Sequence, residues 1–247
     1  MKDAARHLPR FLSNLRRLSY PHSQLSLAFL ESDSADGTHG LIEQLLPELR
    51  AEFADAQLLK QDHNYHSEQP RWEPSQQLRR RSLLAKSRNQ LLDQALGEQS
   101  WVLWLDVDVA DWPTDVIERL LATGKEIVAP NCIVAPGGRT FDYNTFRLKP
   151  GAAGLPWAPY IIDGILQPPV GHGRHYLNDL RQHSLVELDA VGGAMLLVRA
   201  DLHRRGLRFP EQPYKLHIET EGLALLAKEM GYSCWGLPNL EIIHPSR

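Results

Sequence analysis

The fold is decided by the stretch Trp101-Val-Leu-Trp-Leu-Asp-Val-Asp108. Its five leading apolar residues are typical of a strand that is buried on both faces of a mostly parallel sheet. Residues two apart in an extended chain point to the same side, so Asp106 and Asp108 can face one point beyond the carboxyl end of this strand. Open α/β sheets bind their ligands at that end.

The two aspartates predict a divalent metal site. Carboxylates are costly to hold near each other unless a cation lies between them, and the ligand expected with that cation is the diphosphate of a nucleotide-sugar. One alternative stays open at this point. The segment Asp111-Trp-Pro113 begins another helix, and the aspartate pair could simply cap it.

Length and composition limit the class of protein. A chain of 247 residues fits a single α/β domain over positions 1–247. The formal net charge of −3 gives no reason to expect nucleic acid as a partner. Cys132 and Cys234 lack metal-ligand spacing, which leaves at most one disulfide open. No apolar run approaches the ~18 residues that span a membrane and no signal peptide is visible, so we expect this chain to be soluble.

The hydrophobic pattern alternates between helices and strands. Helices are expected at 8–18, 41–49, 78–96 and 114–123, and strands at 24–30, 56–59, 101–105 and 126–130. This order predicts a mostly parallel central sheet flanked by helices. Later segments predict a strand at 194–198, a helix over 218–230 that ends at Gly231, and a last strand at 234–244.

The region 135–185 shows no regular pattern and is dense in glycine and proline. A loop of this length in a compact domain is usually functional, so it is predicted to form a lid or a binding surface. The alternative is a partly ordered insertion.

Arg88 falls on the apolar face of the helix predicted at 78–96. A buried guanidinium needs an anionic partner, which is either a structural carboxylate or a phosphate of a ligand. The neighbouring arginines 79–81 are expected to form a solvated turn of the same helix.

Two further positions suggest function but have structural alternatives. Gly192 and Gly193 allow a close approach of the backbone to a ligand, or an unusual turn. Glu219 and Glu221 lie in the first turn of the helix over 218–230, which Thr220 could cap. The structural alternative is that both glutamates only favour the helix dipole.

Six motifs, in order along nearly the whole chain, resemble the fungal Golgi α-1,6-mannosyltransferases that are subunits of yeast mannan polymerase. The motifs are Leu27-Ala-Phe-Leu-Glu-Ser-Asp-Ser-Ala-Asp-Gly-Thr38, Lys86-Ser-Arg-Asn89, Trp101-Val-Leu-Trp-Leu-Asp-Val-Asp108, Val191-Gly-Gly193, Glu219-Thr-Glu-Gly222, and Gly236-Leu-Pro-Asn239 followed by His244. This order is far more specific than an Asp-x-Asp pair alone.

The resemblance implies a GT-A fold, a Rossmann-like α/β domain that uses Mn²⁺ and GDP-mannose. Asp106 and Asp108 would hold the metal, directly or through water, and His244 would be the third protein ligand; Mn²⁺ accepts both carboxylate and imidazole. The alternative for His244 is a free histidine near the chain end.

The resemblance also assigns roles around the donor and acceptor. The donor site would comprise Glu31 and Asp33 beside guanosine, Arg88 toward the diphosphate, and Asn89, Gly192 and Gly193 nearby. Glu219 or Glu221 would stabilise the oxocarbenium face or orient the acceptor hydroxyl. The implied reaction adds mannose with retention, in α-1,6 linkage, to a mannose-containing glycan that the region 135–185 would contact.

Two departures from the family bear on this interpretation. The family has a membrane anchor and stem, which this sequence does not show. The family also places an apolar strand directly before the motif that begins here at Lys2, and that first strand is absent. Two alternatives therefore stay open: a catalytically silent GT-A-like subunit of a polymerase complex, and a transferase that uses another sugar nucleotide.

Overall fold

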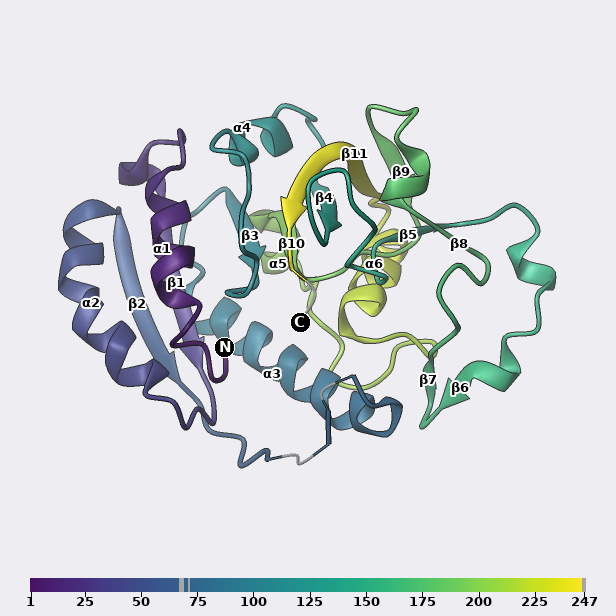
Figure 1. The fold of residues 1–247 in the computed structure, drawn as a ribbon, viewed down its shortest axis with the longest axis horizontal. Coiled ribbons are helices and arrows are strands. Elements are labelled where there is room, and N and C mark those ends of the chain that lie inside the picture. Colours follow the sequence, from purple (N-terminus) through teal and green to yellow (C-terminus); the bar gives the residue numbers. More distant parts are fainter. Residues whose placement is uncertain (67–68, 71, 246–247) are drawn as a thin grey trace.

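The computed structural model describes residues 1–66, 69–70 and 72–245, and its centre is a five-stranded sheet. The strand order is β3 (Trp101–Leu105), β10 (Met195–Arg199), β4 (Ile127–Ile133), β11 (Cys234–Ile243) and β9 (Val186–Leu188). Strands β3, β4 and β11 share one direction, as predicted, whereas β10 and β9 run antiparallel to their neighbours. The sheet is therefore mixed (Figure 1).

A second, smaller sheet lies beside the first. Strands β1 (Ser26–Glu31) and β2 (Asp55–Lys60) pair in parallel and do not join β3. Met1 pairs with the free edge of β1: Ser32 N–H donates to Met1 O at 3.0 Å, and the Met1 amine donates to Leu30 O. Among the described residues no strand joins β1 to β3.

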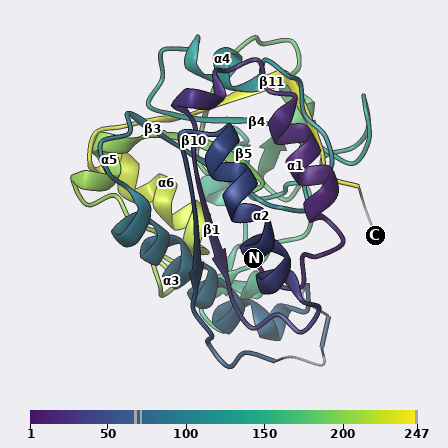
Figure 2. The same cartoon turned by 90° about the vertical axis from the view of Figure 1, so that its left-hand side faces the viewer.

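Helices cover both faces of the five-stranded sheet. Neighbouring residues of a strand point to opposite faces, so their contacts show which helices lie on each face. Val128 and Leu197 belong to the hydrophobic cluster of helices α1 (Leu8–Arg16) and α4 (Val116–Leu121), which continues to α2 (Thr38–Glu52) against β2. Ile127 and Leu196 pack with α3 (Gln77–Ala95), α5 (Ala200–Arg204) and α6 (Glu219–Glu229). Figure 2 shows α1 and α3 on opposite sides of the strands.

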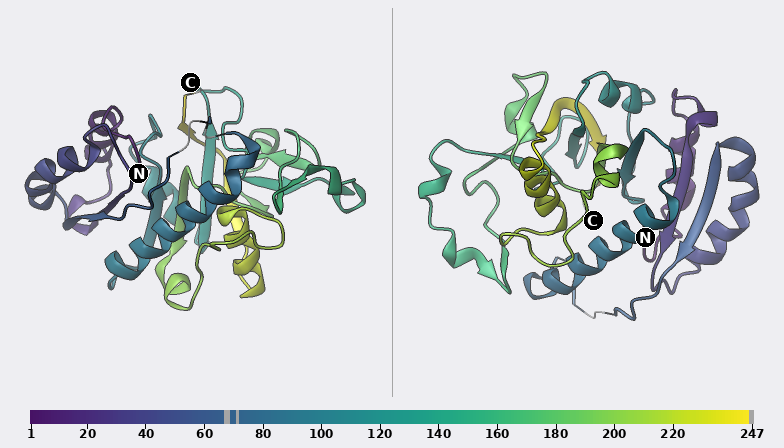
Figure 3. Two further views of the ribbon diagram at one scale, coloured as in Figure 1. Left: turned by 90° about the horizontal axis from the view of Figure 1, so that it is seen from below. Right: turned by 180° about the vertical axis from the view of Figure 1, so that it is seen from behind.

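The region 135–185 is built from short elements rather than one loop. They are the strands β5 (Phe146–Leu148), β6 (Ile161–Ile162), β7 (Ile165–Leu166) and β8 (Arg174–Tyr176), and the 3-10 turns η3 (Ala152–Gly154), η4 (Ala158–Tyr160) and η5 (Leu177–Leu180). Two small antiparallel pairs, β5–β8 and β6–β7, result. Figure 3 shows this region at the end of the molecule opposite α2. The region is therefore more regular than its sequence pattern indicates, and its role as a lid or a binding surface stays a prediction.

Several local predictions can be checked directly. Gly231 ends α6 with a φ of 86°, as a left-handed cap would. The N-cap residue of α6 is Ile218 rather than Thr220, because the helix begins at Glu219, two residues earlier than a Thr220 cap requires. Cys132 and Cys234 are buried and free, so the one disulfide left open does not form. In the described part of the chain no helix is both long and apolar enough to cross a bilayer.

Candidate functional site

Asp106 and Asp108 follow β3 directly, at its carboxyl end. The Asp106 N–H donates at 3.0 Å to the O atom of Ala194, the residue that precedes β10, and Val109 N–H closes a turn back to Asp106 O at 3.2 Å. The next helix, α4, begins at Val116 and has Asp115 as its N-cap residue, so neither Asp106 nor Asp108 lies at its start. The capping alternative for the aspartate pair is therefore wrong.

Asp108 lies next to His244, although the two residues are far apart in the sequence. Asp108 Oδ1 lies 3.2 Å from His244 Nε2. His244 follows β11, stacks on the Phe141 ring with centroids 3.7 Å apart, and is only 7% exposed. It is not a free histidine near the chain end.

The Asp108–His244 pair fits part of a metal site. Two ligand atoms that bind one octahedral ion at about 2.1 Å lie about 3 Å apart, close to the separation seen here. A carboxylate oxygen and an imidazole nitrogen are a donor set that Mn²⁺ accepts. Asp106 turns instead toward Arg88, and no three His, Cys, Asp or Glu side chains of the described residues surround one point. The three-ligand set stays a prediction.

Arg88 has carboxylate partners within the protein. Its Nη1 donates to Glu219 Oε1 at 2.9 Å, and its Nη2 lies 3.6 Å from Asp106 Oδ1. Arg81 Nη1 also donates to Glu219 Oε1, at 3.2 Å. Arg81 is thus a partner of a buried carboxylate rather than part of a solvated turn. Of the two partners expected for Arg88, a structural carboxylate is the one that the structure shows.

Glu219 is the centre of this ion-pair cluster. Its side chain is 1% exposed. Burial favours the neutral acid, but Arg81 and Arg88 outweigh it and hold the Glu219 pKa below its ordinary value. The cluster ties α6 to α3, and through Arg88 it ties both helices to the Asp106 end of β3.

Gly192 and Gly193 make room for two of these charged groups. A Cβ on Gly193 would collide with the Arg88 guanidinium, and one on Gly192 would collide with the Asp142 carboxylate. The predicted close approach is therefore one between the backbone of these glycines and side chains of the protein itself. Contact of the glycines with a donor stays a prediction.

Asp142 is a candidate site residue that the sequence did not reveal. Its carboxylate accepts from Thr145 Oγ1 at 2.8 Å and from Asn144 N–H at 3.0 Å. Burial raises the pKa of Asp142, Glu221 adds to this, and the two hydrogen bonds oppose it. Burial raises the pKa of Cys132, and the negative charges of Asp142, Asp106 and Asp108 add to the effect.

Glu221 occupies a second buried cluster on α6. Its Oε2 lies 2.6 Å from His217 Nδ1, and its Oε1 accepts from Arg174 Nη1 at 3.3 Å. The Arg174 guanidinium also lies over the Phe146 ring at 3.9 Å. Glu221 is 2% exposed, whereas the His217 side chain is 22% exposed. Leu216, the residue before His217, accepts a hydrogen bond from Leu166 N–H of the region 135–185.

The other predicted donor residues are engaged within the protein. Glu31 is 1% exposed, and its Oε1 accepts from Ser34 N–H at 2.8 Å. The Asp33 carboxylate accepts from the Ser32 hydroxyl and from the backbone N–H groups of 63–65, which keep its pKa low against the opposing effect of burial. The Asn89 side-chain amide donates to Phe209 O at 2.9 Å and accepts from Phe209 N–H at 3.0 Å. Their roles in donor binding stay predictions.

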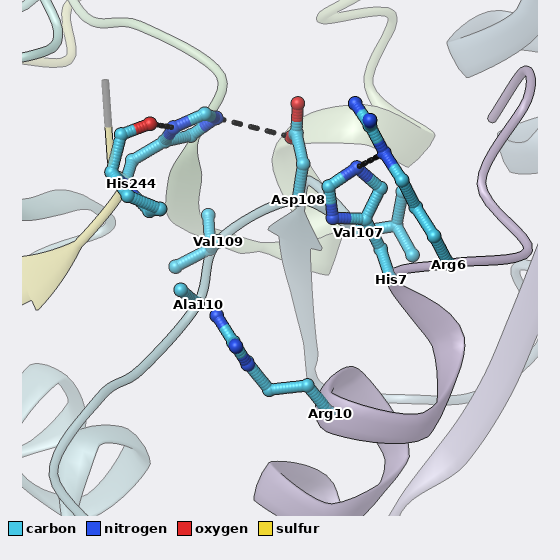
Figure 4. A pocket seen from close by; sticks show the side chains of 9 residues that line it. Arg6, His7, Arg10, Val107, Asp108, Val109, Ala110 and His244 are labelled. Atoms are coloured by element: carbon cyan, nitrogen blue, oxygen red, sulfur yellow. Dashed lines mark hydrogen bonds and ion pairs between the residues drawn. The ribbon is translucent and has the colours of Figure 1, made fainter. Parts of the chain in front are cut away.

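A cavity of about 320 Å³ adjoins the Asp108–His244 pair. One wall is the segment 107–110 with His244 and Pro245, and the other is the start of α1 with Arg6, His7 and Arg10 (Figure 4). No motif or spacing pointed to the residues of α1, because their approach to Asp108 depends on how α1 packs.

Comparison with known proteins agrees with the resemblance inferred from the motifs. The family model Anp1 matches residues 1–213. The chain is 32% identical to the mannan polymerase complex subunit MNN9 of Candida albicans and 31% identical to the mannan polymerase II complex ANP1 subunit of Saccharomyces cerevisiae. These matches cover 97% and 99% of this chain, which spans 72% and 53% of the two relatives' own lengths.

Solved structures with the same fold are more distant in sequence. The mannosyltransferase PcManGT from Pyrobaculum calidifontis, in complex with GDP-Man and Mn²⁺, aligns with a TM-score of 0.59 at 16% identity, over 98% of this chain and 54% of that one. GalNAc-T7 with UDP, GalNAc and Mn²⁺ aligns with a TM-score of 0.54 at 10% identity, over 96% and 40%. At such identities the likeness establishes the fold, which is GT-A. The chain itself, matched by the family model over most of its length, belongs to the Anp1 family.

Proposed function

We propose that this chain is a metal-dependent mannosyltransferase that uses GDP-mannose. It would transfer mannose, with retention, to a mannose-containing glycan in α-1,6 linkage, in a complex with related subunits in the Golgi. The observation that carries the proposal is the Asp108–His244 pair, 3.2 Å apart, beside a cavity at the carboxyl end of β3. The names of the relatives and the donor of the PcManGT complex support the sugar and the nucleotide.

The residues would divide the work as follows. Asp108 and His244 would hold a divalent ion, with Asp106 acting through water. When bound, that ion supplies stabilisation of the negative charge that builds up on GDP as its bond to mannose breaks. No general acid for the leaving group is then required.

Glu219 and Glu221 would act indirectly. Each is 2% exposed and already bound to basic partners, so neither carboxylate is open to a sugar in this arrangement. Glu219 would position Arg88 beside Asp106, and Glu221 would position His217 at the edge of the region 135–185, where the acceptor is expected. Both are therefore proposed as positioning residues.

A thermal-shift series tests the donor. GDP, GDP-mannose, UDP and UDP-glucose would each be added with and without Mn²⁺. A ligand at about 100 times its Kd should raise the melting temperature of a domain of this size by roughly 5 °C or more. We expect this rise with GDP and GDP-mannose in Mn²⁺ only. A response to UDP alone would overturn the choice of nucleotide.

A second candidate function, a binding subunit without turnover, is favoured by the separation of β1 and β2 from the five-stranded sheet. Mannose transfer separates the two. We expect Asp108→Asn to lower transfer at least about 100-fold, since a lost metal ligand removes several kcal/mol of charge stabilisation. Asp115→Asn, at an exposed aspartate of α4, should leave transfer unchanged. Nucleotide binding with no transfer by the wild type would support the silent subunit instead.

A further inference from the structure

The cavity beside Asp108 has a basic wall that the proposed metal site does not explain. Arg6 and Arg10 line it from the start of α1, opposite Asp108 and His244 (Figure 4). The two arginines carry two positive charges, against one negative charge on Asp108. Both arginines are exposed at the mouth of this open pocket. A pocket with this balance of charge favours an anion, and it borders the carboxylate that would hold the metal.

The local structure of α1 adds to this preference. The first turn of α1 contains no acidic residue, so its N-terminal dipole is not neutralised by a carboxylate of its own. Arg6 Nε donates to His7 Nε2 at 3.0 Å, which holds the guanidinium against the neighbouring ring. Arg10 makes no hydrogen bond or ion pair with any residue that the structure describes, although the next arginine of the helix, Arg16, is paired twice.

We propose that Arg6 and Arg10 bind the diphosphate of the donor from the side opposite Asp108 and His244, and retain it on GDP after the sugar leaves. A guanidinium donates two parallel hydrogen bonds to phosphate oxygens, so it suits this role better than an ammonium group. The inference rests on the proposed function for the nucleotide. The anion site itself depends only on the residues of the cavity.

Calorimetric titration of Arg6→Gln, Arg10→Gln and the double variant tests the site. The probes are GDP, inorganic pyrophosphate and guanosine, each in Mn²⁺. Losing a charged hydrogen bond to phosphate should raise the Kd for GDP and for pyrophosphate about tenfold or more in each single variant. Guanosine lacks phosphate, so its Kd should be the same in every variant.

Arg16→Gln is the matched control. It lies on the same helix and pairs with Glu48 and Glu52 of α2, away from the cavity, so all three Kd values should stay at their wild-type levels. Unchanged melting temperatures would confirm that the variants fold. If the wild type binds pyrophosphate but not GDP, and the variants lose pyrophosphate, the anion site holds and the choice of nucleotide fails. Wild-type affinity for GDP and pyrophosphate in the double variant, or no binding of either by the wild type, overturns the inference.

Discussion

At the scale of single residues, the glycine pair 192–193 shows how tightly the site is built. The backbone passes so close to Arg88 and Asp142 that any side chain would displace them. Gly192 N–H also donates to Thr145 Oγ1 at 2.8 Å, and that hydroxyl in turn donates to Asp142. The pair therefore constrains the positions of two charged side chains, of which Arg88 lies beside Asp106.

Gly193→Ala should destabilise the protein by about 1–3 kcal/mol, because the added methyl group forces Arg88 away from Glu219. Urea denaturation measures the effect. Gly40→Ala on α2 is the control, since nothing lies within 4 Å of its added Cβ and alanine favours a helix by up to about 1 kcal/mol. Equal stabilities of Gly193→Ala and the wild type would contradict the close approach.

Sequence identified some of these residues and missed others for a physical reason. Asp106, Asp108 and His244 lie in recognisable motifs next to regular strands, so their region could be predicted. Asp142 and Arg10 reach the site through packing of segments that are far apart in the chain. Packing between distant segments produces no periodic pattern in the sequence, so it could not be predicted.

At the scale of elements, the junction of α3 and α6 holds a cluster of buried and half-buried charges. Glu219 begins α6 and accepts from Arg81 and Arg88, both on α3. Removing one member of a buried pair leaves the others without compensation, which costs more than the pair itself contributes.

Glu219→Gln should therefore lower the free energy of unfolding at pH 7 by about 3 kcal/mol. Because the folded pKa of Glu219 lies below its ordinary value of 4.5, its contribution is complete above that pH and is lost as the pH falls through the folded pKa. The variant should therefore show a flatter loss of stability in acid. Urea denaturation at a series of pH values measures both effects.

Glu229→Gln is the matched control on the same helix. Glu229 lies at the exposed end of α6 and pairs with Lys215 at 2.5 Å. Ion pairs at the surface contribute little, so this variant should unfold like the wild type. If Glu219→Gln behaved in the same way as Glu229→Gln, the account of the α3–α6 junction would be wrong.

Long regular elements were predictable, and short ones were not. Helices such as α2 and α3 show several turns of apolar periodicity, and β3 and β10 are continuous apolar runs. Strands of two or three residues, such as β6 and β8, are too short to show a pattern. Their pairing depends on contacts across the region 135–185. The antiparallel insertion of β10 between β3 and β4 is likewise a tertiary feature.

At the scale of the whole molecule, a buried histidine makes stability depend on pH. His203 is 1% exposed; Trp104 Nε1 donates to its Nε2 at 3.2 Å, and its Nδ1 lies 2.7 Å from Leu207 O. The ring is therefore held neutral, and burial lowers the pKa of His203 from 6.5 to about 4.

The unfolded chain binds a proton at His203 more readily than the folded one. The contribution of His203 to the free energy of unfolding is therefore complete above pH 6.5. It falls by roughly 3 kcal/mol in all as the pH decreases toward about 4. Denaturation between pH 7 and pH 4.5 should show this slope in the wild type. His203→Gln should be less stable at pH 7 but lose less stability over the same range. Parallel slopes for the two proteins would show that His203 does not titrate as described.

The arrangement of the whole molecule places α1, β3 and the end of β11 around one cavity, and the central claim is that Asp108 and His244 bind the metal there. The most direct test is the affinity for Mn²⁺, measured by the loss of the free Mn²⁺ signal in electron paramagnetic resonance. Asp108→Asn and His244→Gln should weaken binding at least about tenfold, since each removes one ligand. Asp115→Asn should bind as the wild type does. Mn²⁺ affinity in Asp108→Asn and His244→Gln equal to that of the wild type would contradict the account.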